Sequence, residues 1–512
     1  MAQKFPCFSL SSSQCALLLL ILFFGLRLFH LQSPLVDHHS WNQVSAAAMA
    51  RHIYYDWKTI FYPTVDLYNN TYEDLTVSAT IPLNRIYAQE FPLYHLPIAF
   101  LYHWFGVEEW PGRIVSILYG IMGLWYLFLL TRLVWGNKIA LLTLLIAGFS
   151  PLAWYFQRAI MSDTSMVSAM TAGFYYFYRW LEERERKKFF WYSLLWTTAA
   201  GIFKTFGLVI GVAYLVLILL RKEYRLLKRP ELYLFALLAW IPTLIWIYHV
   251  LGLETGRSEF SKLDKMLSWE LWWDWQFYKR MIFARLIDQV LTPWMAVFAL
   301  IGIWYSRLSD RRYHLPLAWT AACLFYLFLV QKANFVHDYY QLPFIPGLSI
   351  FAAIGIQKML NFNFNRRLRQ LWLSVFLLLF ITQGGIYFSN HLRMNLGSYQ
   401  TGKKIADLSQ DPEDRVLALD PGADKRNQLI YYSNHNGWFV EELNLEKLEI
   451  FRVYGAKWLG VNLRISPHFD QYRSNLQEIA EKYKKIWEYR DGKDRYGRPM
   501  LSQIYDLRQA TK

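Results

Sequence analysis

Charged residues suited to group transfer occur at the ends of long apolar segments. Asp37 follows the first such segment, Asp163 precedes a later one, and Arg158 lies five residues before Asp163. Lys204 stands between two apolar runs, and His337 opens another. A carboxylate beside an acceptor hydroxyl can act as a general base, and cations can neutralise charge on a departing phosphate. The pattern therefore favours transfer of a group from a phosphate.

Each of these residues also has an ordinary structural interpretation. Asp37 and Asp163 could cap the helices that follow them. Lys204 could extend its ammonium group to the membrane interface, and His337 could be an interfacial histidine with satisfied hydrogen bonds. Ionisable groups at membrane depth are costly and often mark function. Their common position at one end of their segments adds weight to the functional interpretation, and both interpretations stay open.

The composition indicates which class of protein carries these residues. The chain has 512 residues, of which 54% are hydrophobic and 18% aromatic, and a formal net charge of +15. Such high hydrophobicity excludes a disordered chain, and three cysteines exclude a disulfide scaffold. Apolar runs such as residues 232–250 are long enough to cross a bilayer. We therefore expect a mainly α-helical, polytopic membrane protein.

We predict about eleven membrane-spanning helices. The first, near residues 16–29, is interpreted as a retained span rather than a cleaved signal peptide. The others are expected at 112–131, 139–156, 164–180, 189–203, 207–220, 232–250, 290–306, 315–331, 339–357 and 370–388. The apolar segment 91–105 contains two prolines and two histidines. It is expected to form an interfacial helix outside the membrane.

Alternate connections between these spans are strongly basic. They contain Arg132 and Lys138; Arg179, Arg184, Arg186, Lys187 and Lys188; Arg221, Lys222, Arg225, Lys228 and Arg229; Arg307, Arg311 and Arg312; and Lys358, Arg366, Arg367 and Arg369. Lysine and arginine in short loops mark the cytoplasmic side. The N-terminus, with Lys4, is then cytoplasmic, and the positive charge is an orientation signal rather than a nucleic-acid footprint. We expect a multi-pass protein of the plasma (inner) membrane.

This orientation predicts two domains and the parts that lie outside. Residues 1–389 would form a transmembrane catalytic domain, with an outer loop at 32–111, and residues 390–512 a soluble extracytoplasmic α/β domain. In this tail, strands are expected at 415–420, 457–463 and 502–507, and helices at 445–454 and 475–486. Loops 157–163 and 251–289 would also lie outside, the latter with an aromatic belt near Trp272. Asp420 and Pro421 are expected to form a turn.

The order of these features resembles glycosyltransferase family 39 and its relatives of the GT-C fold. That group includes the lipid A aminoarabinose transferases and the protein O-mannosyltransferases. Five short motifs carry the resemblance: Asp37 after the first span, Phe91-Pro92-Leu93-Tyr94 before the second, Asp163, Gly201 with Lys204, and Tyr340 with Leu342-Pro343. The resemblance covers roughly residues 14–390, and the motifs occur in order on one side of the membrane.

The resemblance implies inverting transfer of a hexose or pentose from a polyprenyl phosphate. The acceptor would be a hydroxyl of a lipid, glycan or protein at the outer membrane face. Asp37 and Asp163 would be catalytic, and the phosphate and sugar would be bound by Lys204, Arg158, His337, Tyr340, Arg85 and Glu90. Two positions depart from the family pattern. His38 follows Asp37 where relatives commonly carry a second acid, and Glu90 stands where relatives often carry a basic residue, a charge that Arg85 would supply instead.

A divalent metal is kept as an alternative, and no other cofactor is predicted. His38 and His39 flank Asp37, but adjacent side chains are expected to point in different directions and to chelate poorly. Trp272-Trp273-Asp274 is similar to an oligosaccharyltransferase motif, yet it stands in a loop between spans. The interfacial belt is the preferred interpretation of these tryptophans.

Two other classes of function are compatible with many spans. A transporter or flippase of a lipid-linked saccharide is expected to place charges near the bilayer midplane and to contain repeated halves. The sequence has no clear internal repeat, and its candidate residues lie at the outer ends of spans. A structural or sensory protein would leave the paired aspartates unexplained. The expected partners are thus a polyprenyl-linked sugar, its acceptor and the membrane, not a nucleic acid.

Overall fold

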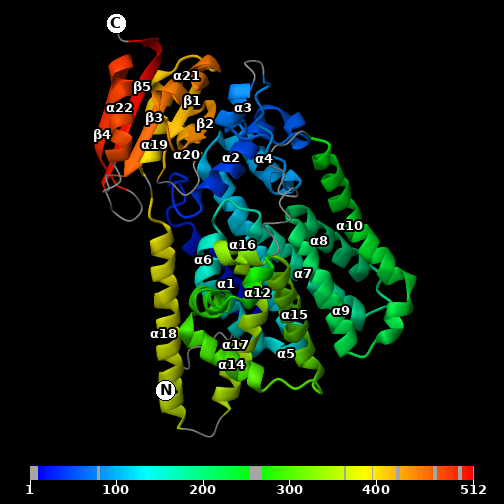
Figure 1. The fold of residues 1–512 in the computed structure, drawn as a ribbon. Coiled ribbons are helices and arrows are strands. Elements are labelled where there is room, and N and C mark those ends of the chain that lie inside the picture. Colours follow the sequence, from blue (N-terminus) through cyan, green and yellow to red (C-terminus); the bar gives the residue numbers. More distant parts are fainter. Residues whose placement is uncertain are drawn as a thin grey trace. The chain divides into compact units, whose positions relative to one another are not determined.

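A computed structural model describes residues 10–77, 81–253, 268–361, 365–394, 396–421, 427–464, 470–493 and 499–510. The chain separates into two compact units. The first consists of Met1–Leu31, Arg113–Tyr248 and Lys262–Phe388, and the second of Gln32–Gly112, His249–Ser261 and Ser389–Lys512. The predicted outer loop thus forms one unit with the C-terminal tail (Figure 1). Each unit is described separately below.

The first unit is helical. Its elements are α1 (Ser12–Arg27), α5 (Glu109–Phe149), α6 (Pro151–Phe156), α7 (Asp163–Glu182), α8 (Lys188–Phe203), η3 (Thr205–Val209), α9 (Ile210–Leu220), η4 (Tyr224–Lys228), α10 (Pro230–Leu251), α12 (Trp269–Trp273), α13 (Trp275–Lys279), η6 (Arg280–Leu291), α14 (Thr292–Trp304), η7 (Arg311–Tyr313), α15 (His314–Leu329), α16 (Gln331–Val336), η8 (Tyr339–Gln341), α17 (Phe344–Leu360) and α18 (Arg366–His391). The ends of α5, α10 and α18 continue into the second unit.

Among the described residues, four helices are long and apolar enough to cross a membrane. They are Glu109–Phe149, Pro230–Leu251, Trp275–Trp304 and Arg366–Leu408. Shorter apolar helices occupy Ser12–Arg27, Thr205–Leu220 and Phe344–Leu360. Every predicted span contains helix, which confirms a mainly helical chain. The number of eleven crossings stays a prediction.

Several predicted boundaries differ from the structure. Spans 112–131 and 139–156 lie largely within one helix, α5, whose two parts meet at Gly136 with φ 76°. Glycine adopts this conformation without a steric penalty, so the chain turns there without a loop. The predicted span 290–306 begins earlier, because η6 and α13 extend the helix back to Trp275. The predicted span 339–357 begins with the 3₁₀ turn η8, and its α-helix starts at Phe344.

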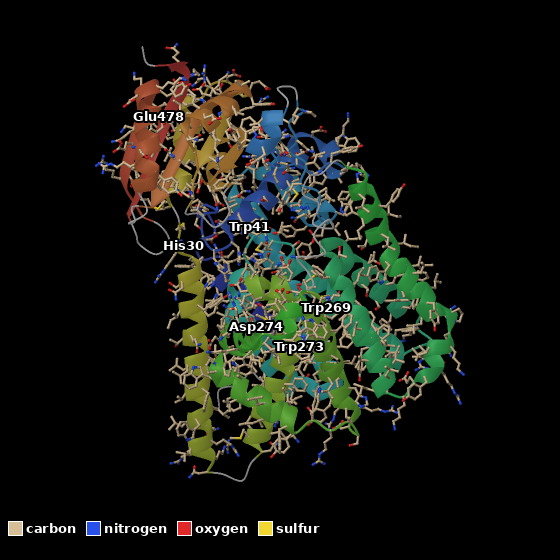
Figure 2. The ribbon with its side chains drawn as sticks, in the orientation of Figure 1. His30, Trp41, Trp269, Trp273, Asp274 and Glu478 are labelled. Atoms are coloured by element: carbon tan, nitrogen blue, oxygen red, sulfur yellow. The ribbon has the colours of Figure 1, made fainter. Side chains whose placement is uncertain are left out.

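The predicted loop 251–289 is partly helical where it is described. Residues 254–267 lie outside the described part of the chain. After them, Trp269 and Trp273 project from α12 and are 71% and 90% exposed (Figure 2). Exposed tryptophans on a short helix fit the predicted interfacial belt. The belt itself stays a prediction.

The described part of the C-terminal tail contains a five-stranded sheet. Its strands are β1 (Arg415–Leu419), β2 (Asn436–Val440), β3 (Ala456–Arg464), β4 (Tyr483–Lys493) and β5 (Pro499–Ala510), in the order β2-β1-β3-β5-β4. Strand β1 runs parallel to β2 and β3, and β5 runs antiparallel to β3 and β4. The three predicted strands are confirmed. Strands β2 and β4 were not predicted, and the helix expected at 475–486 ends at Lys482, where β4 follows.

Helices cover both faces of this sheet (Figure 1). On one face, Val416 and Ala418 pack with α19 (Leu396–Leu408) and α20 (Gln428–Ser433). On the other, Leu417 and Leu419 pack with α21 (Leu445–Val453) and α22 (Asp470–Lys482). Alternation of side chains along β1 supplies both cores, as period-two geometry requires. The small α/β fold predicted for the tail is therefore confirmed.

The outer loop contributes helices and an additional sheet edge to the second unit. It contains α2 (Ser40–Tyr55), η1 (Trp57–Ile60), α3 (Tyr72–Val77), η2 (Pro92–Tyr94) and α4 (His95–Phe105), so a helix does form at 91–105. The Gly437 N–H donates to the Asp66 carbonyl at 3.0 Å, and the Tyr68 N–H donates to the Gly437 carbonyl at 2.8 Å. The loop thereby covers an edge of the sheet, which would otherwise present unpaired backbone groups.

Candidate active site

Asp163 and Lys204 form a buried ion pair in the first unit. Asp163 is the first residue of α7, and Lys204 follows α8 in extended backbone. The Lys204 Nζ lies 2.8 Å from Asp163 Oδ1, and the side chains are 10% and 4% exposed. The pair argues against both ordinary interpretations. Lys204 does not extend to solvent, and the N-cap of α7 is Ser162.

Two tyrosine rings lie beside this ammonium group. Its Nζ lies 4.8 Å from the centroid of Tyr340 and 5.1 Å from that of Tyr339. The Tyr340 ring stacks on Tyr326 with centroids 6.3 Å apart, and the His337 ring lies 6.1 Å from Tyr340. A desolvated cation over aromatic faces is stabilised by about 2 kcal/mol. The first unit thus brings together four predicted residues: Asp163, Lys204, His337 and Tyr340.

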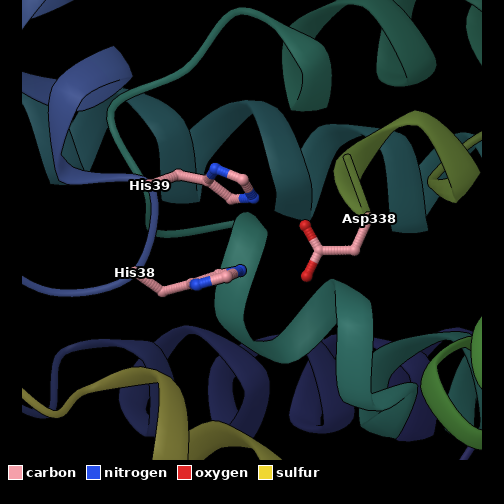
Figure 3. Close-up of side chains that lie close together, drawn as sticks. All are labelled: His38, His39 and Asp338. Atoms are coloured by element: carbon pink, nitrogen blue, oxygen red, sulfur yellow. The ribbon is translucent and has the colours of Figure 1, made fainter. Parts of the chain in front are cut away.

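Arg285 holds the segment that carries His337 and Tyr340, and the sequence did not identify it. Its Nη2 donates to the carbonyls of Phe335 and Val336 at 3.4 and 3.3 Å, at the end of α16. Its Nη1 lies 3.9 Å from Asp338 Oδ2. The Tyr387 hydroxyl donates to the same carboxylate at 3.3 Å. Figure 3 shows the Asp338 carboxylate, which precedes η8.

The position of Arg285 explains why it was missed. It lies in η6, a π-helix, and π-helical turns occur often at functional sites. The surrounding segment was predicted to be an outer loop, in which an arginine is unremarkable. Arg285 contacts residues about 50 positions away in the sequence, so no pattern among its neighbouring residues predicts these contacts.

Two buried arginines hold the chain just after α1. Arg158 Nη2 donates to the His30 carbonyl at 2.8 Å, and Arg113 Nη1 donates to the Leu31 carbonyl at 2.7 Å. Both arginines are at most 1% exposed. Arg158 was predicted to bind phosphate. At least one of its N–H groups donates to a backbone carbonyl instead. Phosphate binding by the rest of the guanidinium stays a prediction.

Asp37 lies in the second unit and is 2% exposed. Gln43 Nε2 donates to its Oδ1 at 2.6 Å. The N-cap of α2 is His39, in the left-handed region at φ 51°, so Asp37 does not occupy the capping position. The carboxylate is thus held by a side chain one turn into the following helix.

The two histidines after Asp37 correct one expectation. Their rings were expected to diverge, yet their centroids lie 4.1 Å apart, and Figure 3 shows both rings on the same side of the loop. The left-handed backbone at His39 allows this arrangement. The His391 ring lies 4.3 Å from that of His38. Taken by itself, neither unit gathers three such ligands at metal-binding distances among its described residues.

Arg85 and Glu90 also belong to the second unit. The Arg85 Nη1 donates to Asn436 Oδ1 at 2.5 Å, a contact between the outer loop and β2. Glu90 is half-buried in the bend before η2. Arg85 thus has a structural contact, and the predicted roles of both residues in binding stay predictions.

Asp274, in the sequence Trp272-Trp273-Asp274, caps a helix. Its side chain accepts a hydrogen bond from the Gln276 N–H at the start of α13, at 2.8 Å. The Trp272 ring packs on Phe328 with centroids 5.4 Å apart. Helix capping and ring packing account for these residues without an oligosaccharyltransferase-like motif.

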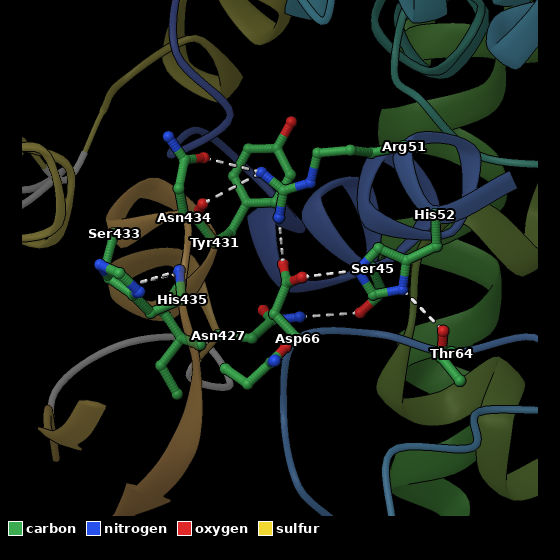
Figure 4. A network of polar contacts seen from close by, with 12 residues as sticks. Ser45, Arg51, His52, Thr64, Asp66, Asn427, Tyr431, Ser433, Asn434 and His435 are labelled. Carbon is green, nitrogen blue, oxygen red and sulfur yellow. Dashed lines mark hydrogen bonds and ion pairs between the residues drawn. The ribbon is translucent and has the colours of Figure 1, made fainter. Parts of the chain in front are cut away.

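A buried charge network joins the outer loop to the tail (Figure 4). Asp66 accepts from Arg51 Nη2 at 2.6 Å and lies 2.9 Å from His52 Nε2. Arg51 also donates to Asn434 Oδ1 at 2.9 Å. Burial alone would raise the pKa of Asp66, but the Arg51 charge and the His52 hydrogen bond lower it to about 2. Asp66 is therefore ionised at neutral pH.

The fold combines apolar helices long enough to cross a membrane with a small C-terminal α/β sheet. Residues 90–249 match the family described as dolichyl-phosphate-mannose-protein mannosyltransferase. None of the curated proteins matches the sequence. The comparison with solved structures identifies particular relatives of the same fold.

The fold is similar to that of ArnT from Cupriavidus metallidurans bound to undecaprenyl phosphate. The TM-score is 0.65 at 13% identity, over 96% of this chain and 98% of that chain. The Archaeoglobus fulgidus oligosaccharyltransferase with zinc and sulfate gives a TM-score of 0.56 at 10% identity, over 92% of this chain and 72% of that chain. AglB from the same organism, with an inhibitory peptide and a dolichol-phosphate, gives 0.53 at 12% identity, over 94% and 74%. The resemblance to GT-C glycosyltransferases is confirmed.

Proposed function

We propose that this protein is an inverting glycosyltransferase that uses a polyprenyl phosphate-linked sugar. Its acceptor is a hydroxyl of a lipid, glycan or protein at the outer face of the membrane. The observation that carries the proposal is the buried Asp163–Lys204 pair among tyrosines. ArnT, which has a similar fold, was crystallised with undecaprenyl phosphate, and the structure of AglB is a complex with a dolichol-phosphate.

The proposed reaction assigns a task to each charged group. The acceptor oxygen attacks the anomeric carbon while the bond from that carbon to the phosphate oxygen breaks. Asp37 takes the acceptor proton as general base, and polyprenyl phosphate leaves. Lys204 neutralises charge on the departing phosphate, which is where a fixed cation lowers the barrier most. Asp163 keeps Lys204 oriented, and His337 and Tyr340 shape the binding site beside it.

The proposal places the reaction outside the cytoplasm of a plasma (inner) membrane. The N-terminus would be cytoplasmic, and the second unit would be exposed on the outer side. Alternating basic connections support this orientation. A periplasmic reporter fused after residue 390 should be active, and a cytoplasmic signal would overturn the orientation.

A divalent metal is the alternative part of the proposal. The oligosaccharyltransferase of the same fold was crystallised with zinc. Activity should be compared after dialysis against EDTA and after return of Zn²⁺, Mn²⁺ or Mg²⁺. Activity unchanged by chelation would restrict the mechanism to the protein's own charged residues.

The decisive experiment uses the full-length protein in vesicles with radiolabelled polyprenyl phosphate hexoses and pentoses. Acceptors come from lipid and glycan fractions of cells that lack the protein. We expect labelled product from one donor, and loss of about 10²- to 10⁴-fold of the rate in Asp37→Asn and Asp163→Asn. Asp56→Asn is the matched control, because Asp56 lies in the same outer loop and caps η1 at the surface.

Two results would contradict the proposal. Full activity in both Asp37→Asn and Asp163→Asn would contradict the roles assigned to the two carboxylates. Movement of a lipid-linked saccharide across the vesicle membrane, with no labelled acceptor, would instead support the transporter or flippase. Both are measured in the same vesicles.

A further inference from the structure

The C-terminal tail holds the backbone on both sides of Asp37. The Leu35 N–H donates to the Tyr432 hydroxyl at 2.5 Å. The His38 N–H donates to the His391 carbonyl at 3.1 Å. These bonds come from residues more than 350 positions later in the chain, and both lie within the second unit. The segment that carries Asp37 is therefore fixed by the tail and not by its own loop alone.

The start of the following helix is held by the same part of the tail. Gln428 Nε2, on α20, donates to the Ser40 Oγ at 2.5 Å. Asn427 Nδ2, just before α20, donates to the Ser45 Oγ at 2.8 Å, one turn further along α2. Helix α2 also supplies Gln43, whose amide holds the Asp37 carboxylate. Fixing α2 thus fixes the group that orients the carboxylate.

A third set of contacts with the tail holds α2 at Arg51. Arg51 binds Asn434 and stands over the ring of Tyr431, with 4.6 Å between its guanidinium carbon and the ring centroid (Figure 4). Buried and paired charges of this kind are costly to break. Consequently, α2 is joined to the short helix α20 and the residues that flank it at Ser40, Ser45 and Arg51, and Asp37 lies at one end of that contact.

Tyr432 has the properties of a fixed anchor. Its side chain is 3% exposed. Burial and the nearby Glu109 carboxylate raise its pKa well above the ordinary value, so the hydroxyl stays neutral. A neutral hydroxyl can accept from the Leu35 N–H and donate to Glu109 at the same time. Replacement by phenylalanine keeps the ring and removes only these bonds.

We propose that the C-terminal domain positions the catalytic carboxylate, and that Tyr432 is a positioning residue for Asp37. This inference rests on the proposed function, in which Asp37 is the general base. A base must be held within a fraction of an ångström of its productive position, which requires support from surrounding residues. The domain therefore contributes to the chemistry without touching the substrate.

The test compares two phenylalanine substitutions in the full-length protein in lipid nanodiscs. Tyr432→Phe removes the anchor beside Asp37. Tyr454→Phe is the matched control, because the Tyr454 hydroxyl donates to the Leu75 carbonyl at 3.1 Å and also joins the tail to the outer loop. Amide hydrogen exchange over residues 33–45 and steady-state kinetics are measured for both variants.

For Tyr432→Phe we expect faster exchange over residues 33–45. We also expect kcat lower by roughly 10-fold, with the KM for the donor changed less than about twofold. Tyr454→Phe should raise exchange near Leu75 and leave kcat within about twofold. Gln428→Leu, which removes a second anchor, should resemble Tyr432→Phe.

The outcomes separate this inference from the proposed function. Unchanged exchange over 33–45 in Tyr432→Phe and Gln428→Leu would overturn it, as would faster exchange with an unchanged kcat. If the wild-type protein transfers no sugar from any donor, the proposed function is wrong. In that case the exchange data still decide whether the tail holds the segment around Asp37.

Discussion

Lys204 Nζ lies 2.8 Å from Asp163 Oδ1, although 41 residues separate the two in sequence. The contact joins the start of α7 to the end of α8, two helices that pack along their lengths. A buried charge pair is weak support for stability, because removing both charges from water costs about as much as their attraction returns. The buried pair therefore favours a role in binding or catalysis over a role in stability alone.

Substitutions of Lys204 should distinguish the contribution of its positive charge to sugar transfer from that of its side-chain packing. Lys204→Met keeps the length of the side chain but removes the cation, and we expect the rate of sugar transfer to fall by at least about 100-fold. Lys204→Arg keeps the charge but has a different shape, and partial activity is expected. Initial rates with the preferred donor provide the measurement.

The control for this prediction is Lys358→Met. The Lys358 ammonium also lies over a tyrosine ring, 5.4 Å from the centroid of Tyr305, near the end of α17. Its loss should leave transfer unchanged. Equal damage in Lys358→Met and Lys204→Met would mean that the lysines act through membrane insertion and not through phosphate.

Asp66→Asn should destabilise the second unit strongly. Asp66 neutralises Arg51, and the side chains are 7% and 9% exposed. Breaking such a buried pair leaves an uncompensated charge and costs roughly 3–5 kcal/mol. Asp411→Asn is the comparison, because Asp411 pairs with Lys457 but is 54% exposed, and the expected cost is about 0–1 kcal/mol. Thermal unfolding of both variants measures the difference, and similar melting temperatures would contradict the prediction.

His95 should make the second unit sensitive to mild acid. Burial lowers its pKa from 6.5 to about 4. As pH falls from 6.5 to 4, the unfolded chain takes up a proton that the folded unit does not. The free energy of unfolding should fall by on the order of 3 kcal/mol over this interval.

His95→Gln is the variant that checks this pH dependence. Its unfolding should depend less on pH between 6.5 and 4 than that of the natural sequence. The contribution of Asp66 is lost at lower pH, as its folded pKa is about 2, so the two effects are separable. Identical pH profiles for the two proteins would rule out His95 as the source.

Asp274→Ala tests whether the Trp272-Trp273-Asp274 sequence has a catalytic role. Since Asp274 caps α13, its loss should cost about 1 kcal/mol and leave sugar transfer nearly unchanged. A loss of activity comparable to that of Asp163→Asn would show that capping is not its main role. Transfer rates and melting temperatures of the same preparation are sufficient.

The sequence predicted what depends on local pattern. Runs of apolar residues located a helix in every predicted span, and alternating residues located β1, β3 and β5. It missed β2, where Asn436-Gly437 has little strand preference and pairing with β1 decides the structure. The sequence also missed the kink at Gly136, where a loop was expected between two separate spans. The glycine alone does not distinguish a kink within one helix from a loop between two helices, because tertiary contacts decide between them.

The candidate site was predicted only in part, for the same physical reason. Asp163, Lys204, His337 and Tyr340 were identified from their places at helix ends, and the structure brings them together. Arg285 was missed since its role depends on contacts with the distant α16. Likewise, no local pattern indicates that Tyr432 touches Leu35, because that contact exists only after the tail has packed on the outer loop.

The joining of the outer loop to the tail has a consequence for biosynthesis. Arg51 and Asn434, which bind one another, are 383 residues apart. At a synthesis rate of about 5–20 residues per second, the tail residues that bind the outer loop are made roughly 20–80 s after the loop. During this time Asp66 and the backbone that will cover β2 have no sheet to join. The segment around Asp37 is therefore fixed only late in synthesis, after the tail has been made. A chain that is truncated before the tail would insert in the membrane without the contacts that hold Asp37.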